Sequence, residues 1–133
     1  MEIKNVILLA EDDESHFILE TIALRKAGIN DDIIRFSDGN EVLNFFMNSD
    51  NFSKENIKYI LLMDVKLPKF DGIEIMKKLK SNIEFKNTPF FLISACQTEE
   101  NIKLFNEYGC SGYITKPMDD SSIKMIQHKL AFA

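Results

Sequence analysis

The stretch IKYILLMDVKLPKFDG, residues 57–72, decides the fold of this chain. Five consecutive apolar residues, Tyr59 to Met63, lead to a single acid, Asp64, and to a turn that ends at Pro68. An uninterrupted apolar run of this length, closed by a proline turn, predicts a parallel strand buried on both faces. Asp64 then lies at the carboxyl end of the strand, where open α/β sheets bind ligands. Taken alone, this acid could equally begin a turn or cap the next helix.

Length and composition limit what the chain can be. With 133 residues, 45% of them hydrophobic, it is long enough for one domain with a substantial core and too short for two. A formal net charge of -5 argues against binding nucleic acid through its phosphates. The amino terminus has no signal-peptide pattern, and no apolar run is long enough to span a bilayer. We therefore expect a cytoplasmic protein in which residues 1–133 form one domain without an output domain and without contact to nucleic acid or membrane.

The cysteines and histidines do not suggest a structural metal site. Cys96 and Cys110 stand in no CxxC or metal-ligand spacing, and the two histidines are isolated from each other. Both cysteines are predicted to be reduced small hydrophobic residues, not a disulfide. Cys96, two residues after Ser94, is expected in the core or at a helix start.

Strand-like and helix-like segments alternate along the chain. The predicted strands are residues 3–10, 32–36, 58–63, 90–94 and 112–115. The first helix is indicated by the helical spacing of Phe17, Ile18, Ile22, Ala23 and Leu24 and ends before Gly28. The later helices are predicted at residues 39–47, 72–79, 99–108 and 121–130. The polar segment 48–56 is predicted to be a loop and the most disordered part of the chain.

Five strands that alternate with five helices predict an α/β fold, a doubly wound parallel sheet with helices on both faces. Right-handed crossovers leave few topologies for five such units, and the flavodoxin-like order 2-1-3-4-5 is the natural one. The chain has no internal repeat, low-complexity tract or interdomain linker.

Polar residues follow four of the predicted strands at their carboxyl ends. They are Glu11, Asp12, Asp13, Asp64, Ser94, Thr115 and Lys116. These strand ends converge on one crevice in a doubly wound sheet. Carboxylates packed so closely repel one another unless a cation neutralises them. Oxygen ligands of this kind suit Mg²⁺, which keeps open positions for a phosphoryl group.

With a magnesium ion in this crevice, Asp64 can act as a nucleophile that takes a phosphoryl group and forms an aspartyl phosphate. Lys116 supplies a positive charge to one phosphoryl oxygen, and the Ser94 hydroxyl can donate a hydrogen bond to another. Phosphoryl transfer depends mostly on positioning and charge neutralisation, so no separate general base is required.

Four segments of the chain match one known family in order and spacing. They are ILLAEDD (7–13), LLMDVKLP (61–68) followed by Asp71-Gly72, LISA (92–95) and GYITKP (112–117). With these segments the chain resembles the receiver domains of two-component response regulators, over essentially its whole length. The resemblance is to stand-alone receivers of the chemotaxis type, which are not enzymes beyond promoting their own phosphoryl transfer and autodephosphorylation.

The resemblance implies that Asp64 is phosphorylated by a histidine kinase or a histidine phosphotransfer protein. It implies a Mg²⁺ site made of Asp12, the Asp64 carboxylate and the backbone carbonyl of Lys66, with Glu11 acting through a water molecule. Asp13 is expected to be solvated or to cap a helix.

The resemblance also assigns a switch. Lys116 would contact the phosphoryl group, and its bond to the following proline is usually cis in this family. Phosphorylation would draw Ser94 toward the phosphoryl group and turn Tyr113 inward. The signal would then change the face formed by residues 99–108, 112–115 and 121–130.

Some expectations concern the surroundings of the site. Lys66 lies at its mouth, where the side chain could pair with Glu11 or with the phosphoryl group, and we expect it to alter the lifetime of the phosphorylated state. The loop at 48–56 is similar to those of stand-alone receivers that pair with phytochrome-like kinases. We expect a monomer or a weak dimer; the downstream protein target is open.

Rival functions differ at particular residues. A phosphatase of the haloacid dehalogenase type needs a second acid two residues after the nucleophile, where this chain has Lys66. A flavodoxin-type carrier needs a phosphate loop rich in glycine and hydroxyl residues after the first strand, where this chain has three acids. The alternative that stays open is a receiver-like interaction module that is never phosphorylated.

Overall fold

A computed structural model describes residues 3–48, 56–95 and 97–132 of the chain. The strands are β1 (Lys4–Ala10), β2 (Asp32–Phe36), β3 (Ile57–Asp64), β4 (Phe90–Ser94) and β5 (Gly112–Thr115). The helices are α1 (Glu14–Lys26), α2 (Gly39–Met47), α4 (Gly72–Lys80), α5 (Glu99–Tyr108) and α6 (Asp120–Phe132). Each predicted strand and helix is found, with ends that agree or shift by one or two residues. Residues 49–55, predicted as a loop, and Cys96 lie outside the described residues.

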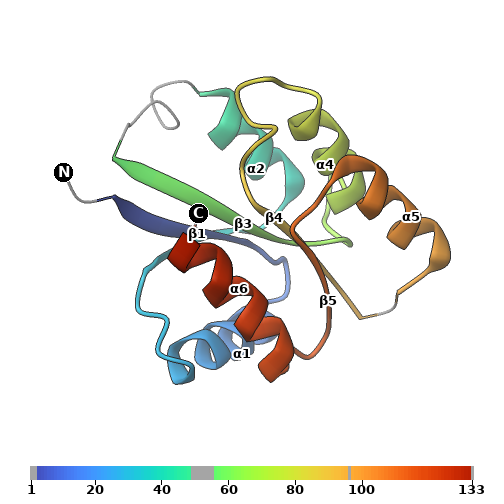
Figure 1. Ribbon diagram of the computed structural model, residues 1–133. Coiled ribbons are helices and arrows are strands. Elements are labelled where there is room, and N and C mark those ends of the chain that lie inside the picture. Colours follow the sequence, from blue (N-terminus) through green and yellow to red (C-terminus); the bar gives the residue numbers. More distant parts are fainter. Residues whose placement is uncertain (1–2, 49–55, 96, 133) are drawn as a thin grey trace.

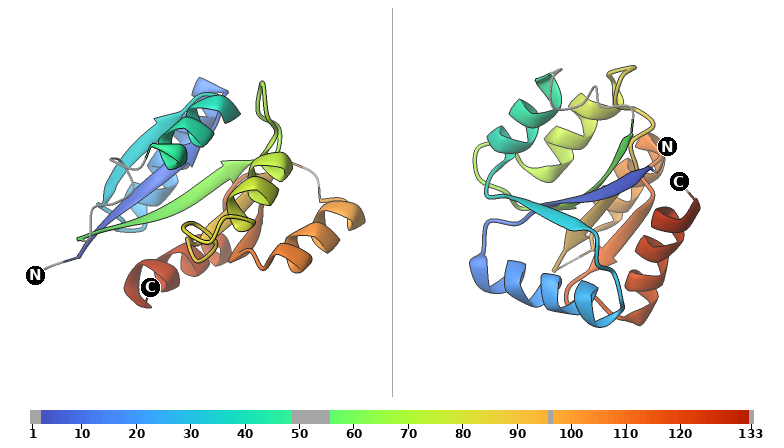
Figure 2. Two further views of the ribbon diagram at one scale, coloured as in Figure 1. Left: turned by 90° about the horizontal axis from the view of Figure 1, so that it is seen from above. Right: turned by 90° about the vertical axis from the view of Figure 1, so that its left-hand side faces the viewer.

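The five strands are all parallel and form one sheet in the order β2-β1-β3-β4-β5. This order confirms the predicted flavodoxin-like fold. Helices α1 and α6 cover one face of the sheet, and α2, α4 and α5 cover the other (Figures 1 and 2). The sheet therefore separates two apolar cores.

The central strand β3 is buried on both faces because its apolar residues alternate between the two cores. Leu61 and Met63 pack with the residues of α2 and α4, whereas Ile60 and Leu62 pack with those of α1 and α6. The strand runs one residue further than predicted, so that Asp64 is its last residue and pairs with Ile93 of β4. The sheet itself therefore fixes the backbone that carries this acid.

Short polar residues start four of the helices by accepting a backbone N–H three residues later. They are Asp13, Asp38, Asp71 and Thr98. The start of α4 also requires a glycine, because a Cβ atom on Gly72 would lie 2.5 Å from the backbone oxygen of Asp64. This close approach packs the helix directly against the end of β3.

Helix α1 presents apolar residues to solvent. The helical spacing predicted Ile18 and Ile22 together with the core residue Leu24, but in the structure Ile18 is 48% and Ile22 44% exposed. Leu19 is 64% exposed, while Glu20 is buried. The helix was predicted correctly, but the spacing alone did not determine which of its apolar residues face the core, because tertiary contacts set the orientation of a helix about its axis.

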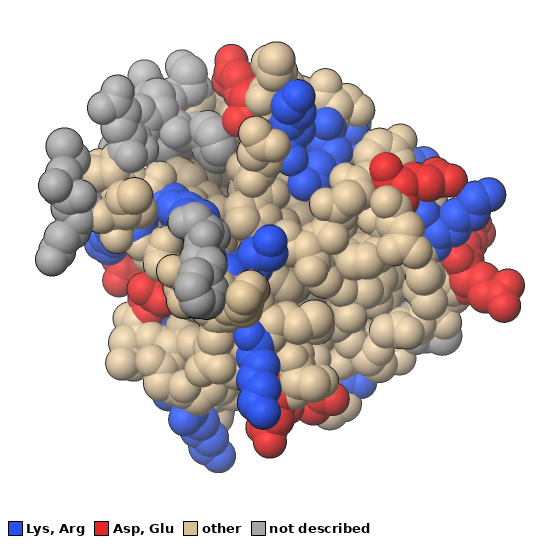
Figure 3. All heavy atoms as spheres, viewed as in Figure 1, with Lys and Arg blue, Asp and Glu red and all other residues tan. Residues whose placement is uncertain are grey.

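No helix within the described ranges is both long and apolar enough to cross a lipid bilayer. On the face seen in Figure 3, both signs of charge are present, and uncharged atoms cover the surface over β5. The described residues on this face form no continuous basic patch of the kind that binds nucleic acid.

Candidate functional site

A cleft of about 500 Å³ lies at the carboxyl ends of β1, β3, β4 and β5. Its walls include six of the seven residues predicted for this edge of the sheet, Glu11, Asp12, Asp13, Asp64, Ser94 and Lys116, and also Lys66, whereas Thr115 does not line it. Four separate pieces of the chain therefore meet in one place, as the strand order requires.

Asp64 is held at the floor of the cleft by both of its carboxylate oxygens. Its Oδ1 atom accepts a hydrogen bond from the backbone N–H of Lys66 at 3.0 Å, and Oδ2 accepts one from Lys116 Nζ at 2.5 Å. The residue is 6% exposed. A carboxylate in this position is oriented by two donors and still reaches the cleft.

Three carboxylates converge beside the end of β1. Glu11, Asp12 and Asp64 each offer an oxygen atom, and these atoms all lie within 4.8 Å of one another. Glu11 is buried, whereas Asp12 is exposed. This acidic group can bind a divalent metal, because hard cations such as Mg²⁺ are held by carboxylate oxygens with water in the remaining positions.

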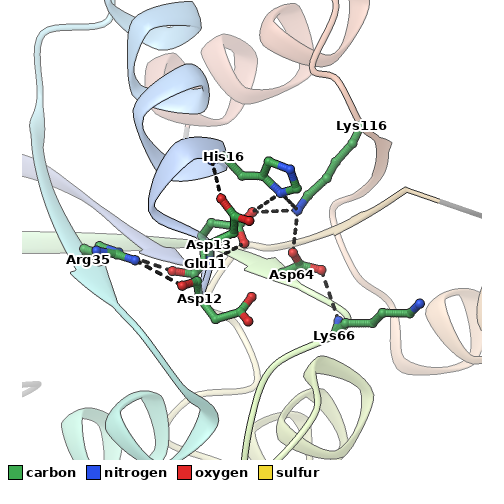
Figure 4. Close-up of polar contacts among 8 residues, drawn as sticks. All are labelled: Glu11, Asp12, Asp13, His16, Arg35, Asp64, Lys66 and Lys116. Atoms are coloured by element: carbon green, nitrogen blue, oxygen red, sulfur yellow. Dashed lines mark hydrogen bonds and ion pairs between the residues drawn. The ribbon is translucent and has the colours of Figure 1, made fainter.

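Lys116 connects two of these carboxylates. Its ammonium donates to Glu11 Oε1 at 2.6 Å and to Asp64 Oδ2 at 2.5 Å (Figure 4). Burial lowers the pKa of Lys116, but the hydrogen bonds and negative charges of Asp64 and Glu11 outweigh this effect and raise the pKa above its ordinary value. The peptide bond to Pro117 is cis, as expected from the resemblance. The lysine is therefore a fixed positive charge at the phosphoacceptor candidate.

A family model for the response regulator receiver domain matches residues 7–127 of the chain. The chain belongs to the receiver family. The acidic pocket of Glu11, Asp12 and Asp64 is typical of a receiver's phosphoacceptor site. Receivers are not enzymes in the usual sense, and in general they act together with a kinase.

Several other receivers are similar to this one. Response regulator Rcp1 of Synechocystis is 27% identical over 92% of this chain and 84% of its own. The structure of the Mn²⁺-bound form of Rcp1 has a TM-score of 0.74 at 28% identity, covering 96% of this chain and 92% of that one. A receiver domain from Rhodospirillum rubrum has a TM-score of 0.78 at 30% identity, with the same coverage. The bacteriophytochrome response regulator AtBRR has a TM-score of 0.80 at 25% identity, covering 100% of this chain and 96% of that one.

Arg35 of β2 holds the loop that carries the acidic pair of this receiver. Its Nε donates to the backbone oxygen of Glu11 at 3.2 Å and its Nη2 to that of Asp12 at 3.3 Å (Figure 4). The guanidinium also stacks on the ring of Phe17, 5.0 Å from the centroid. Arg35 therefore fixes the backbone of the two acids through contacts that the sequence pattern does not reveal.

His16 reaches the site from the first turn of α1. Its Nδ1 atom lies 3.2 Å from Lys116 Nζ and 3.9 Å from Glu11 Oε1. The side chain is 50% exposed, so it lies at the rim of the cleft. In the sequence it was counted only as an isolated histidine, because its partner is 100 residues away.

Glu20, one turn further along α1, is buried behind the acidic pair. It is 6% exposed, and neither carboxylate oxygen has a hydrogen-bond partner in the described structure. Burial, reinforced by the negative charge of Glu11 and partly offset by Lys116, raises the pKa of Glu20 to about 8. Burial of Glu20 therefore favours the protonated form of this carboxyl group.

The two residues predicted to form a switch lie on neighbouring strands. Ser94, the last residue of β4, is buried and lines the cleft. Tyr113 of β5 packs edge-on against Phe105 of α5, with ring centroids 6.0 Å apart. Its hydroxyl is shielded from solvent and has no hydrogen-bond partner among the described residues. The tyrosine ring already lies against α5 in this structure.

The predictions for two residues that flank the site, Asp13 and Lys66, compare differently with the structure. Asp13 caps α1 by accepting the backbone N–H of His16 at 3.0 Å, which confirms its predicted capping role. Lys66 is exposed, and in Figure 4 its ammonium points away from Glu11 and Asp64. The pairing of Lys66 with Glu11 is thus not formed here, and its effect on a phosphorylated state stays a prediction.

Proposed function

We propose that this receiver takes a phosphoryl group onto Asp64 from a histidine kinase or a histidine phosphotransfer protein, in a reaction that depends on Mg²⁺. The observation that carries the proposal is the ammonium of Lys116, which lies between Asp64 and Glu11 at hydrogen-bond distance from both. A buried aspartate with a lysine and two further carboxylates beside it has every group that phosphoryl transfer to a carboxylate needs.

The residues present fit a magnesium ion. We assign Asp12 and the Asp64 carboxylate as direct ligands together with the backbone carbonyl of Lys66, and Glu11 as a ligand through water. Mg²⁺, when bound, would neutralise the carboxylates and polarise the phosphoryl oxygens. The Mn²⁺-bound structure of Rcp1 supports a divalent-metal site in this family.

Asp64, Lys116 and Ser94 would each have a separate role in the phosphoryl transfer. An Asp64 oxygen attacks the phosphorus atom, and the bond from phosphorus to the donor nitrogen breaks. The Asp64 carboxylate gives up its hydrogen bond from Lys116, and the ammonium then donates to a phosphoryl oxygen. The Ser94 hydroxyl, at the adjacent strand end, donates to a second oxygen.

The surface beside the cleft suits a protein phosphodonor. Exposed Leu19 and the loop after β5 border an apolar hollow of about 460 Å³ that adjoins Lys116. Ile18 and Ile22 extend the apolar surface along α1. Apolar area of this kind, next to a reactive group, suits docking of another protein. The similarity to AtBRR, a bacteriophytochrome response regulator, supports a phytochrome-like histidine kinase as the donor.

The output of the reaction would be a change on the face of α5, β5 and α6. Movement of Ser94 toward the phosphoryl group would free space for further inward movement of Tyr113, which already contacts α5 through Phe105. The uncharged surface over β5 in Figure 3 is consistent with a face that a target protein can cover.

Incubation with acetyl phosphate or with beryllofluoride, each with Mg²⁺, tests the proposal. The wild type should gain one phosphoryl group by mass spectrometry and show saturable beryllofluoride binding. Asp64→Asn should show neither, while Asp71→Asn, which alters a helix cap outside the cleft, should behave as the wild type. A wild type that stays unlabelled with every donor would favour the receiver-like interaction module.

A further inference from the structure

The ammonium of Lys116 has three N–H donors, and three atoms that can accept a hydrogen bond lie within 3.2 Å of it. Two bonds go to carboxylates, Asp64 Oδ2 and Glu11 Oε1. The third contact is His16 Nδ1 at 3.2 Å. An ammonium has no fixed donor plane and turns freely about its carbon–nitrogen bond, so its orientation depends on its acceptors. The histidine completes the set that fixes this group.

The position of the imidazole is itself determined by the chain. Asp13 caps α1 through the backbone N–H of His16, which fixes where the first turn of the helix begins. The ring projects from this turn over the cleft, with Nδ1 toward Lys116 (Figure 4). For Nδ1 to accept from an ammonium, its lone pair must be free and the ring proton must be on Nε2. His16 then adds an acceptor to the site without adding negative charge.

We propose that His16 is a positioning residue for Lys116, holding one donor of its ammonium so that another is aimed at the phosphoryl oxygen when Asp64 is modified. The inference rests on the proposed function. When Asp64 is phosphorylated, its bond from Lys116 is exchanged for a bond to the phosphoryl group. Glu11 and His16 keep the other two bonds, and the ammonium stays in place. Without His16, only the Glu11 bond holds it.

The variants His16→Ala and His16→Asn separate a positioning role from a role in folding. Asparagine carries an acceptor oxygen at the same number of bonds from the backbone as Nδ1, and alanine carries none. His128→Ala removes the other histidine, which lies exposed on α6, and serves as the matched control. Urea unfolding of each variant shows whether the fold is intact.

Two measurements are required. The first is the rate of labelling by phosphoramidate at saturating Mg²⁺, over a range of donor concentrations. A hydrogen bond to a charged group supports an effect of about tenfold on the maximal rate for His16→Ala, with the half-saturating donor concentration unchanged. His16→Asn should recover most of the rate. The second is the nitrogen-15 NMR signal of the Lys116 ammonium, which should be retained in His16→Asn and broadened in His16→Ala because its protons exchange faster.

The outcomes separate the two proposals. If the wild type is not labelled, the proposed function fails, and the ammonium signal alone decides whether His16 holds Lys116. If the wild type and His16→Ala are labelled at equal rates, the positioning role is wrong while the proposed function stands. The positioning role is also wrong if His16→Ala and His16→Asn lose the same amount of labelling rate. It is wrong as well if a lowered urea midpoint accounts for the lost rate.

Discussion

Replacement of Glu20 by glutamine should change how the stability of this receiver depends on pH. In the folded state Glu20 is 6% exposed and keeps its proton up to a pH of about 8, whereas the unfolded chain releases it near the ordinary value of 4.5. Between these values unfolding releases a proton, so that a rise in pH favours unfolding. The contribution of Glu20 to the unfolding free energy is fully present below its pKa in the unfolded chain. It is lost as the pH rises through its pKa in the folded state.

The size of the effect follows from the difference between the two pKa values. Each pH unit within this range costs about 1.4 kcal/mol of unfolding free energy for one group. Between about pH 6 and about pH 7.5 the wild type should therefore lose about 2 kcal/mol because of Glu20 alone. This is a large part of the total stability of a small domain, about 5 to 15 kcal/mol. Glu20→Gln stays neutral throughout and should lack this loss.

Urea unfolding followed by far-UV circular dichroism, in the presence of EDTA, measures the effect. The matched control is Glu41→Gln, which makes the same change at an exposed position of α2 and should keep the wild-type pH dependence. Any contribution of the histidines is common to the three proteins and cancels in the comparison. Parallel plots of unfolding free energy against pH for the wild type and Glu20→Gln would refute the reasoning.

Three further substitutions test other parts of the site. Gly72→Ala places a Cβ atom against the backbone of Asp64 and should lower the unfolding free energy by about 1–3 kcal/mol in urea titrations; an unchanged midpoint would contradict the close approach. Arg35→Ala frees the backbone of the acidic loop and should weaken Mg²⁺ binding about tenfold by calorimetric titration, with no recovery in Arg35→Lys; equal affinities would show that Arg35 does not support the metal site. Lys66→Ala should change the dephosphorylation half-life of the labelled protein; equal half-lives would dispose of a role for this exposed lysine.

The sequence predicted the fold and which residues meet at the cleft, because the strands follow from local patterns and their order follows from the rules for connections. The apolar run before Asp64 identifies a buried strand, and the order of five such runs determines which strand ends meet. Lys116 was predicted to lie beside Asp64 from the strand order together with the resemblance to receivers, although it comes 52 positions later in the chain.

The residues that support the site could not be predicted in the same way. Arg35 donates hydrogen bonds to backbone oxygens of the acidic loop. Every residue has such an oxygen, so the sequence does not indicate which of them accepts. In the sequence, Glu20 looks like any acidic residue on the exposed side of a helix. Only the packing of α1 against the sheet shows that it is buried. Such contacts depend on the rotation of a helix about its axis, which the spacing of apolar residues did not determine here.

The rotation of α1 links the buried acid to the exposed apolar surface. Only three residues separate the end of β1 from the start of α1, and the last of them is the capping residue Asp13, so the loop leaves the helix little freedom to rotate. His16 and Glu20, one turn apart, therefore face the site, and Ile18 and Ile22, also one turn apart, face solvent. A helix turned to bury Ile18 and Ile22 would remove His16 from Lys116. The exposure of Ile18 and Ile22 is thus a consequence of how the site is built, and under the proposed function this apolar surface is available for the docking of a protein phosphodonor.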